Sequence, residues 1–368
     1  MKQLNRLLPT WNPLLVLFAI LLAGWEKPCL VTLYAAERAP EQIYVELAKL
    51  PANERQKRLE EGSRKEGPLQ FIHTFRGKQA RGHLRLFEKR YPFLKVEMSD
   101  MGSQDAAERL IAEETAGRHL TDVVSLGVPD LPIIIKQNLL ARYPTPASKR
   151  IFKQYAGFLD AENRWLPWYW SEHGISYNPN LISPDKAPKS WFDLCNPAYR
   201  GQISFDPAET RFLVGLHVMM GEEKLKEWLK CIGENQPIIQ RGHTQRIQLM
   251  LSGDHAIQAD NYFFDGAREK AGNPKAPFVI VYTAPVLAYA GAMVVNKNTP
   301  HPFAAALLSD WMLSQESQEY VAAEFRGPVA SKHPFLPDHV KLITYGYFSD
   351  DIVSRLHDYW NQHIGRKK

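Results

Sequence analysis

The clearest hydrophobic pattern lies between residues 69 and 126, where short apolar runs alternate with amphipathic segments. The segments between the runs repeat apolar residues every three or four positions, which places them on one helical face. This alternation of strand and helix predicts βαβαβ units, and hence an α/β fold with a parallel sheet. The apolar runs have the length of β-strands and lie at 69–75, 93–100 and 120–126.

The loops that follow these predicted strands are rich in glycine, serine and other polar residues. Ligands of open α/β sheets bind outside the carboxyl ends of the strands, so these loops are the expected binding edge. None of the three loops contains an obvious pair of nucleophile and base. Ser103 is expected to be the N-cap of the second helix. The loops lie at 74–77, 100–104 and 125–128.

The rest of the chain predicts a second lobe followed by a return to the first. Charged helices, interrupted by Pro51, precede the first strand. A tryptophan-rich strand after residue 165 is interpreted as a crossover into the second lobe. The predicted divisions are a signal peptide (1–36), a helical lead-in arm (37–67), lobe 1 (68–165 and 283–345), lobe 2 (166–282) and a C-terminal helix and tail (346–368).

The N-terminus predicts export from the cytoplasm. Lys2 and Arg6 precede an apolar run at 14–24, which is too short to span a bilayer comfortably. A basic region followed by a short apolar region is typical of a secretory signal peptide, and the alternative is an uncleaved N-terminal anchor. After cleavage the protein is expected to be periplasmic or extracytoplasmic. Cys195 and Cys231 remain, and they either pair or are two buried thiols.

Composition excludes several classes of protein. The chain has 368 residues, of which 45% are hydrophobic and 23% charged, which is typical of a globular protein of about two domains. Its formal charge is +5, and segment 1–36 contributes three basic side chains and one acidic side chain, leaving +3. No basic run is long enough to predict nucleic-acid binding. No catalytic motif or zinc spacing is present, so the sequence predicts neither an enzyme nor a cofactor.

An ordered series of short motifs resembles the extracellular solute-binding proteins of ABC importers, especially the iron(III), spermidine/putrescine and phosphonate branch. The resemblance covers roughly residues 67–334. It implies the two-lobed type II periplasmic-binding-protein fold, with two crossovers and a ligand cleft between the lobes. It also implies capture of a small polar or anionic solute by hinge closure, and delivery to the membrane subunits of an ABC permease. The motifs are FEKRYPFLKVE (87–97), Gly102-Ser103, AGRHLTDVV (116–124), YNPNL (177–181), WFDL (191–194), Arg200-Gly201 and SQESQE (314–319).

Iron(III) binders of this family use paired tyrosines with a histidine and a carboxylate. The corresponding stretch here contains Tyr262 followed by Phe263. The loop expected to carry the histidine reads Phe75-Arg76-Gly77, and the place of the carboxylate lies near Gly127. The resemblance therefore argues against simple ferric binding, and no metal ligand is assigned. A modified ferric site remains an alternative.

The remaining polar groups favour an anion or a polar organic solute. Gly102 and Ser103 stand at a predicted helix N-terminus, where backbone N–H groups and the helix dipole attract anions. Thr244 is expected to be the N-cap of another helix. The candidate ligand-binding residues are Arg76, Ser103, Gln104, Tyr169, Glu172, Arg241, His243, Thr244, Asp260, Asn261 and Tyr262.

Two further alternatives are open. The tryptophans at 165, 168 and 170 either cage an amine such as a polyamine or pack in the core and hinge. An amine would also require acidic groups, for which Glu172, Asp206 and Asp260 are the candidates. The same fold also occurs in enzymes and in sensors that dock on a receptor kinase. The predicted partners are a small-molecule or ion ligand and an ABC permease, and the protein is expected to be a monomer.

Overall fold

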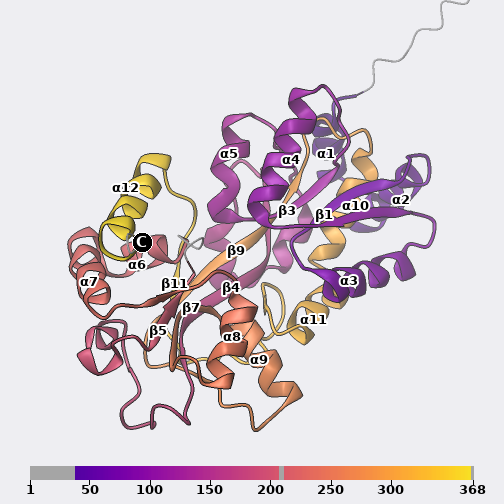
Figure 1. Cartoon of the computed structure of the whole chain (residues 1–368). Coiled ribbons are helices and arrows are strands. Elements are labelled where there is room, and N and C mark those ends of the chain that lie inside the picture. Colours follow the sequence, from indigo (N-terminus) through magenta and orange to yellow (C-terminus); the bar gives the residue numbers. More distant parts are fainter. Residues whose placement is uncertain (1–37, 207–210, 366–368) are drawn as a thin grey trace, which may run out of the picture. The chain divides into compact units, whose positions relative to one another are not determined.

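The computed structural model describes residues 38–206 and 211–365 (Figure 1). The predicted signal peptide lies outside this range. The described residues belong to one compact unit, Arg38–Lys368, and they form an 11-stranded mixed sheet with twelve α-helices. The main path of the sheet runs β2-β1-β3-β9-β4-β7-β5-β6. Within the described ranges, no helix combines the length and apolar character needed to cross a membrane.

The lead-in segment forms two short helices, as the sequence predicts. Helix α1 (Pro40–Ala48) and helix α2 (Ala52–Ser63) are separated at Pro51, which lacks a backbone N–H and fits only the first turn of the second helix. Helix α2 packs against α10 (Pro302–Met312). The buried Arg55 of α2 pairs there with Asp310 of α10. The lead-in segment is therefore tied to the core of the protein by a buried ion pair.

The first half of the sheet confirms the βαβαβ prediction. Its parallel strands are β1 (Leu69–His73), β2 (Val96–Asp100) and β3 (Val123–Gly127), in the order β2-β1-β3. Helix α3 joins the first two strands and helix α4 the next two, and the amphipathic faces predicted from the sequence turn toward the sheet. The helices of this half are α3 (Gly77–Arg90), α4 (Ser103–Thr115) and α5 (Leu131–Lys136).

The second half repeats this arrangement, and two of its three strands are shorter. Strands β5 (Ile203–Phe205), β6 (Ile238–Ile239) and β7 (Ile257–Tyr262) are parallel to one another. Four helices surround them: α6 (Arg211–Met220), α7 (Glu222–Glu234), α8 (His243–Ser252) and α9 (Phe263–Gly272). Figure 1 places these helices around β5 and β7, whereas α3, α4 and α10 surround β1 and β3.

Two long antiparallel strands, β4 (Leu166–Tyr177) and β9 (Val286–Val295), connect the halves. Every residue of both strands is buried, so neither face of these strands is open to solvent. These are the two crossovers expected from the sequence. Short strands attach to them: β8 (Val279–Ile280), β10 (Gly327–Pro328) after helix α11 (Gln315–Ala323), and β11 (Leu342–Thr344), which precedes helix α12 (Asp350–Trp360).

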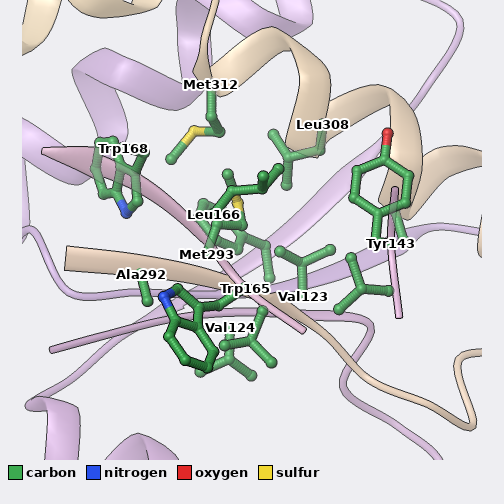
Figure 2. Close-up of a cluster of buried hydrophobic side chains, with 14 of the residues drawn as sticks. Val123, Val124, Tyr143, Trp165, Leu166, Trp168, Ala292, Met293, Leu308 and Met312 are labelled. Carbon is green, nitrogen blue, oxygen red and sulfur yellow. The ribbon is translucent and has the colours of Figure 1, made fainter. Parts of the chain in front are cut away.

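The buried side chains form two hydrophobic clusters, which define two lobes. Lobe 1 is built on the cluster that includes β1, β3, α3, α4 and α10. Lobe 2 is built on the cluster that includes β5, α6, α7 and α12. The tryptophans at 165, 168 and 170 belong to the lobe 1 cluster and are at most 8% exposed. Figure 2 shows Trp165 and Trp168 among aliphatic side chains, so these tryptophans pack in the core and do not form a cage for an amine.

A disulfide bond connects Cys195 with Cys231, with 5.4 Å between the Cα atoms. It joins the short 3-10 helix Phe192–Cys195 to helix α7 within lobe 2. The sequence left open whether these two cysteines pair or are two buried thiols, and in the structure they pair. It also agrees with the predicted export, because disulfides persist in oxidising compartments.

Candidate functional site

A cavity of about 810 Å³ opens between the two lobes, and both lobes contribute to its walls. The lobe 1 wall includes the ends of β1, β2 and β3, which are the three loops that the sequence singled out as the binding edge. Eight of the eleven predicted ligand-binding residues line this cavity: Arg76, Ser103, Gln104, Tyr169, Arg241, His243, Thr244 and Tyr262.

The N-terminus of helix α4 forms part of the lobe 1 wall. Gly102 is the N-cap of this helix and Ser103 is its first residue, so the prediction that Ser103 is the N-cap is wrong. The Ser103 hydroxyl instead accepts a hydrogen bond from the Gly127 N–H at 2.7 Å. This bond joins the loops after β2 and β3. The N–H groups of the first helical turn have no partner within the helix, and they form a region that favours an anion.

A hydrogen-bonded group of side chains reinforces the same wall. The hydroxyl groups of Thr74 and Ser125 are 2.8 Å apart, and the Thr74 hydroxyl lies 3.3 Å from that of Tyr169. The Trp168 indole donates to Ser125 at 3.1 Å from the core side. Arg76 lines the cavity, is exposed, and donates to the Asp100 carbonyl. Within this wall Tyr169 is therefore held by hydrogen bonds, whereas the Arg76 side chain is exposed.

An irregularity in strand β7 controls which side chains reach the lobe 2 wall. One residue of β4 faces two residues of β7 between the pairs Gly174–Asn261 and Ser176–Gln258. This is a β-bulge, and Asp260 within it has a left-handed backbone with φ of 60°. Because side chains alternate along a strand, the extra residue changes which face Tyr262 occupies. Tyr262 lines the cavity, whereas Asp260 and Asn261 do not.

Asp260 and Asn261 have structural partners away from the cavity. The fully buried Asp260 carboxylate lies 2.7 Å from the Arg246 guanidinium, which is also fully buried. Burial raises the pKa of Asp260 to about 6, and the Arg246 charge limits that rise. The Asn261 amide donates to the Ser176 hydroxyl at 3.0 Å. Both residues therefore make contacts behind the cavity wall, and neither of them lines the cavity.

Glu172 also lies outside the cavity. Tyr169 and Ser171 on β4 face the cavity, and alternation along the strand directs Glu172 to the opposite side. There it is 1% exposed, and its carboxylate lies 2.9 Å from the His333 Nε2. Thr244 does line the cavity, but it is the second residue of α8, so its predicted role as N-cap is wrong; Gly242 is the N-cap. The Thr244 hydroxyl donates to Asp265 at 3.3 Å.

Two tyrosines on lobe 2 and the crossover bring their phenol oxygens together. Tyr262 and Tyr289 have their hydroxyl groups 2.8 Å apart, and the His243 ring lies 4.4 Å from the Tyr262 ring. The nearby Asp206 carboxylate accepts the Gly242 N–H at 2.7 Å. Hard ferric ions favour phenolate oxygen, so these tyrosines are the residues that a modified ferric site would use. Among the residues with described positions, no group of three or more histidine, cysteine or acidic side chains has metal-binding geometry.

The structure adds cations that the sequence did not identify. Arg211, Arg268 and Arg326 line the cavity, and no motif marks any of them. Arg211 of lobe 2 forms an ion pair with Asp130 of lobe 1 at 3.1 Å, and Arg268 forms one with Asp265 at 3.2 Å. The described part of the lining contains six arginine and lysine side chains and three aspartates. This balance favours an anionic or hydrogen-bonding ligand over a polyamine.

A family model described as bacterial extracellular solute-binding protein matches residues 122–349. The chain is 27% identical to a probable ABC transporter periplasmic-binding protein of Sinorhizobium fredii over 260 residues, which cover 66% of this chain and 68% of that protein. It is 26% identical to a putrescine/agmatine-binding protein of Pseudomonas aeruginosa, covering 58% of this chain and 65% of the relative.

The fold is also similar to solved structures. The periplasmic binding protein AfuA of Actinobacillus pleuropneumoniae, with fructose-6-phosphate bound, superposes with a TM-score of 0.69. The alignment has 21% sequence identity and covers 82% of this chain and 99% of that one. The structure and these similarities agree on a type II periplasmic-binding-protein fold.

Proposed function

Because the chain belongs to the bacterial extracellular solute-binding proteins, we propose that it binds a small polar or anionic solute in the cavity between its lobes and delivers it to an ABC permease. The observation that supports this proposal most directly is that both lobes contribute residues to the walls of one cavity. Residues from both lobes line a space of about 810 Å³, a size suited to a small molecule. Closure of the lobes would remove such a ligand from water and present the closed form to the membrane subunits.

The charge of the lining favours an anionic ligand over cationic ligands such as those that one of the relatives binds. The relative from Pseudomonas aeruginosa binds putrescine or agmatine, which are cations. In this cavity the described lining has twice as many arginine and lysine side chains as aspartates, with six against three. AfuA, in contrast, was crystallised with a sugar phosphate. We therefore place a small organic anion ahead of an amine as the cargo.

The proposed role is binding without catalysis. The named relatives are binding proteins of transport systems. We propose that the mature protein acts as a monomer outside the cytoplasm, with no nucleic-acid partner and no resident cofactor. The predicted signal peptide and the Cys195–Cys231 disulfide both support export. The chromatographic mass of the exported chain and its processed N-terminus test these two points.

A thermal-shift screen tests the proposal. A ligand at 100 times its Kd adds about 2.7 kcal/mol to the stability of the form that binds it. The panel contains phosphate esters, phosphonates, carboxylates, polyamines, uncharged sugars and Fe(III). At least one compound is expected to raise Tm in a saturable manner and to reduce the radius of gyration. If none does so while a substrate is turned over, the proposed transport function is wrong.

A matched pair of variants ties the binding to the cavity. Arg76→Gln removes a cation from the lining, and Arg81→Gln removes an exposed cation from the same helix region outside the lining. Only the first variant is expected to weaken an anionic ligand. Equal effects of the two variants would show that the ligand responds to net charge and not to this cavity.

A further inference from the structure

We propose that Arg326 forms an oxyanion-binding subsite at the junction of the two lobes, and that the cargo is a small organic molecule with a carboxylate, phosphate or phosphonate group. This inference rests on the proposed function, and it names the chemical group that the cavity recognises. Arg326 lies between helix α11 and strand β10 and lines the cavity.

Arg326 differs from the other buried arginines of the protein. In the part of the chain that the structure describes, three arginines are less than 9% exposed: Arg55, Arg246 and Arg326. Arg55 pairs with Asp310, and Arg246 pairs with Asp260. Arg326 is 8% exposed, and within the described ranges its side chain makes no hydrogen bond or ion pair, although the Nε atoms of all three arginines lack a hydrogen-bond partner. A buried charge without a counter-charge is costly, so the unfilled position of the partner points to a ligand.

Three aromatic rings lie close to this guanidinium. Its Cζ lies 3.7 Å from the ring centroid of Phe264, 4.4 Å from that of Phe75 and 5.5 Å from that of Tyr169. Cation–π contacts use the faces of a guanidinium. The N–H donors lie at its edge, in a planar fork that matches two oxygens of a carboxylate or phosphate. The aromatic rings therefore stabilise the charge by cation–π attraction and leave its N–H donors without a protein partner among the described residues, available to an oxyanion.

The contacts of Arg326 also connect the lobes. Phe75 and Tyr169 belong to the lobe 1 cluster, and Phe264 belongs to the lobe 2 cluster. Next to this contact, the Arg268 guanidinium of lobe 2 donates to the Glu324 carbonyl at 3.4 Å and lies 5.9 Å from the Phe264 ring. An oxyanion on Arg326 would therefore bind where the lobes meet. Its binding would favour the arrangement described here, in which Phe264 of lobe 2 lies against the guanidinium.

The lobe 1 wall of the same cavity offers a place for the rest of the ligand. The N-terminus of α4 at Gly102–Ser103 lines the same cavity, and it provides N–H groups for a hydroxyl or a second oxyanion. The buried, unpaired Arg326 is the independent observation that gives this helix N-terminus a ligand-binding role. A monoanion with hydroxyl groups or a dianion fits Arg326 together with this N-terminus, whereas a polycation does not.

The test measures binding of defined probes to the purified protein by calorimetry and thermal shift. The probes are inorganic phosphate, methylphosphonate, glucose 6-phosphate and citrate, with glucose and putrescine as comparators. The variants are Arg326→Gln, Arg326→Lys and the control Arg118→Gln, which removes an exposed cation outside the cavity. At least one oxyanion probe is expected to bind the wild type. Arg326→Gln should weaken it about 10- to 150-fold, which is the range for a hydrogen bond to a charged group, and Arg118→Gln should leave it unchanged.

The phosphate and carboxylate probes identify which oxyanion the subsite prefers. Equal affinity of the wild type and Arg326→Gln for an oxyanion would overturn the subsite. Binding of putrescine or glucose alone would also overturn it, while the solute-binding function would stand. Failure of every probe and every compound of the wider panel would overturn both.

Unliganded stability provides a second readout that does not depend on the probe. Arg55→Gln removes a paired buried arginine and is expected to lower Tm. Arg326→Gln removes a charge that has no protein counter-charge, so its Tm should fall by much less. If Arg326→Gln loses as much Tm as Arg55→Gln, Arg326 is a structural residue and the subsite is refuted.

Discussion

The strongest stability prediction concerns a chain of hydrogen bonds that holds two buried histidines in the neutral form. The Phe75 N–H donates to the His73 Nδ1 at 3.1 Å, so the proton of His73 is on Nε2. That nitrogen lies 3.1 Å from the His83 Nδ1, and the His83 Nε2 lies 2.8 Å from the Ser317 hydroxyl. Ser317 in turn donates to the Met312 carbonyl at 2.9 Å. Every N–H and O–H donor in this chain of hydrogen bonds therefore has an acceptor while both histidines are neutral.

Burial lowers the pKa of His83 to about 3, and it also lowers that of His73, with contributions from His83 and Arg326. The ordinary histidine pKa in an unfolded chain is about 6.5. As the pH falls below this value, the unfolded state binds a proton that the folded state does not. The contribution of these neutral histidines to the free energy of unfolding is therefore fully present above pH 6.5, and it is lost as the pH falls toward 3. For His83 alone, the loss between pH 7.5 and 4.5 is about 2.7 kcal/mol.

The variant His83→Phe separates this effect from the rest of acid unfolding. At pH 7.5 it should be less stable by about 1–3 kcal/mol, because the His73 N–H loses its acceptor in the core. The variant has no proton to gain at position 83, so the wild type should lose about 2.7 kcal/mol more than the variant between pH 7.5 and 4.5. The stability difference is therefore expected to approach zero or change sign.

Urea unfolding at pH 7.5, 6.0, 5.0 and 4.5 measures this difference. His339→Phe, at an exposed position, is the control, and it should keep the pH dependence of the wild type. A stability difference between the wild type and His83→Phe that stays constant over this range would refute the assignment of a neutral, buried His83.

Three further predictions concern other parts of the structure. Asp260→Asn leaves Arg246 buried without its carboxylate, so urea unfolding at pH 7.5 should show a loss of about 3–5 kcal/mol; a loss below about 1 kcal/mol would contradict the buried pair. The Cβ added in Gly291→Ala would overlap the Tyr169 ring, so the ligand-induced rise in Tm should disappear, and an unchanged rise would exclude Tyr169 from the site. Reduction of the disulfide that closes residues 195–231, 36 positions apart, should remove about 4 kcal/mol, and equal urea midpoints with and without reductant would contradict this.

Local sequence pattern was sufficient for the first half of the sheet. The strands at 69–73, 96–100 and 123–127 carry apolar runs of strand length, and the helices between them carry a single apolar stripe. The position of the cavity followed from the same pattern, because the carboxyl ends of parallel strands share one edge of a sheet. This is why Arg76, Ser103 and Gln104 could be assigned to the lining in advance.

Local pattern failed where a contact between distant segments decides the outcome. Ser103 has the side chain of an N-cap, but the Gly127 N–H, 24 positions away, competes for its hydroxyl. The β-bulge at Asp260 changes which residues of β7 face the cavity, and it depends on the register with β4. Glu172 was misplaced because the sequence does not indicate which face of a fully buried strand meets the cavity.

The sequence by itself determined the elements, their order and the family, because hydrophobic periodicity and short motifs are local properties. Only the tertiary structure decided which charges are paired. Arg55, Arg246 and Arg326 have the same side chain, and their partners are 255 positions away, 14 positions away and absent from the described residues, respectively. Burial acts on all three, but the counter-charge is supplied by packing between distant segments. In the case of Arg326, packing supplies three aromatic rings and leaves the counter-charge to the cargo.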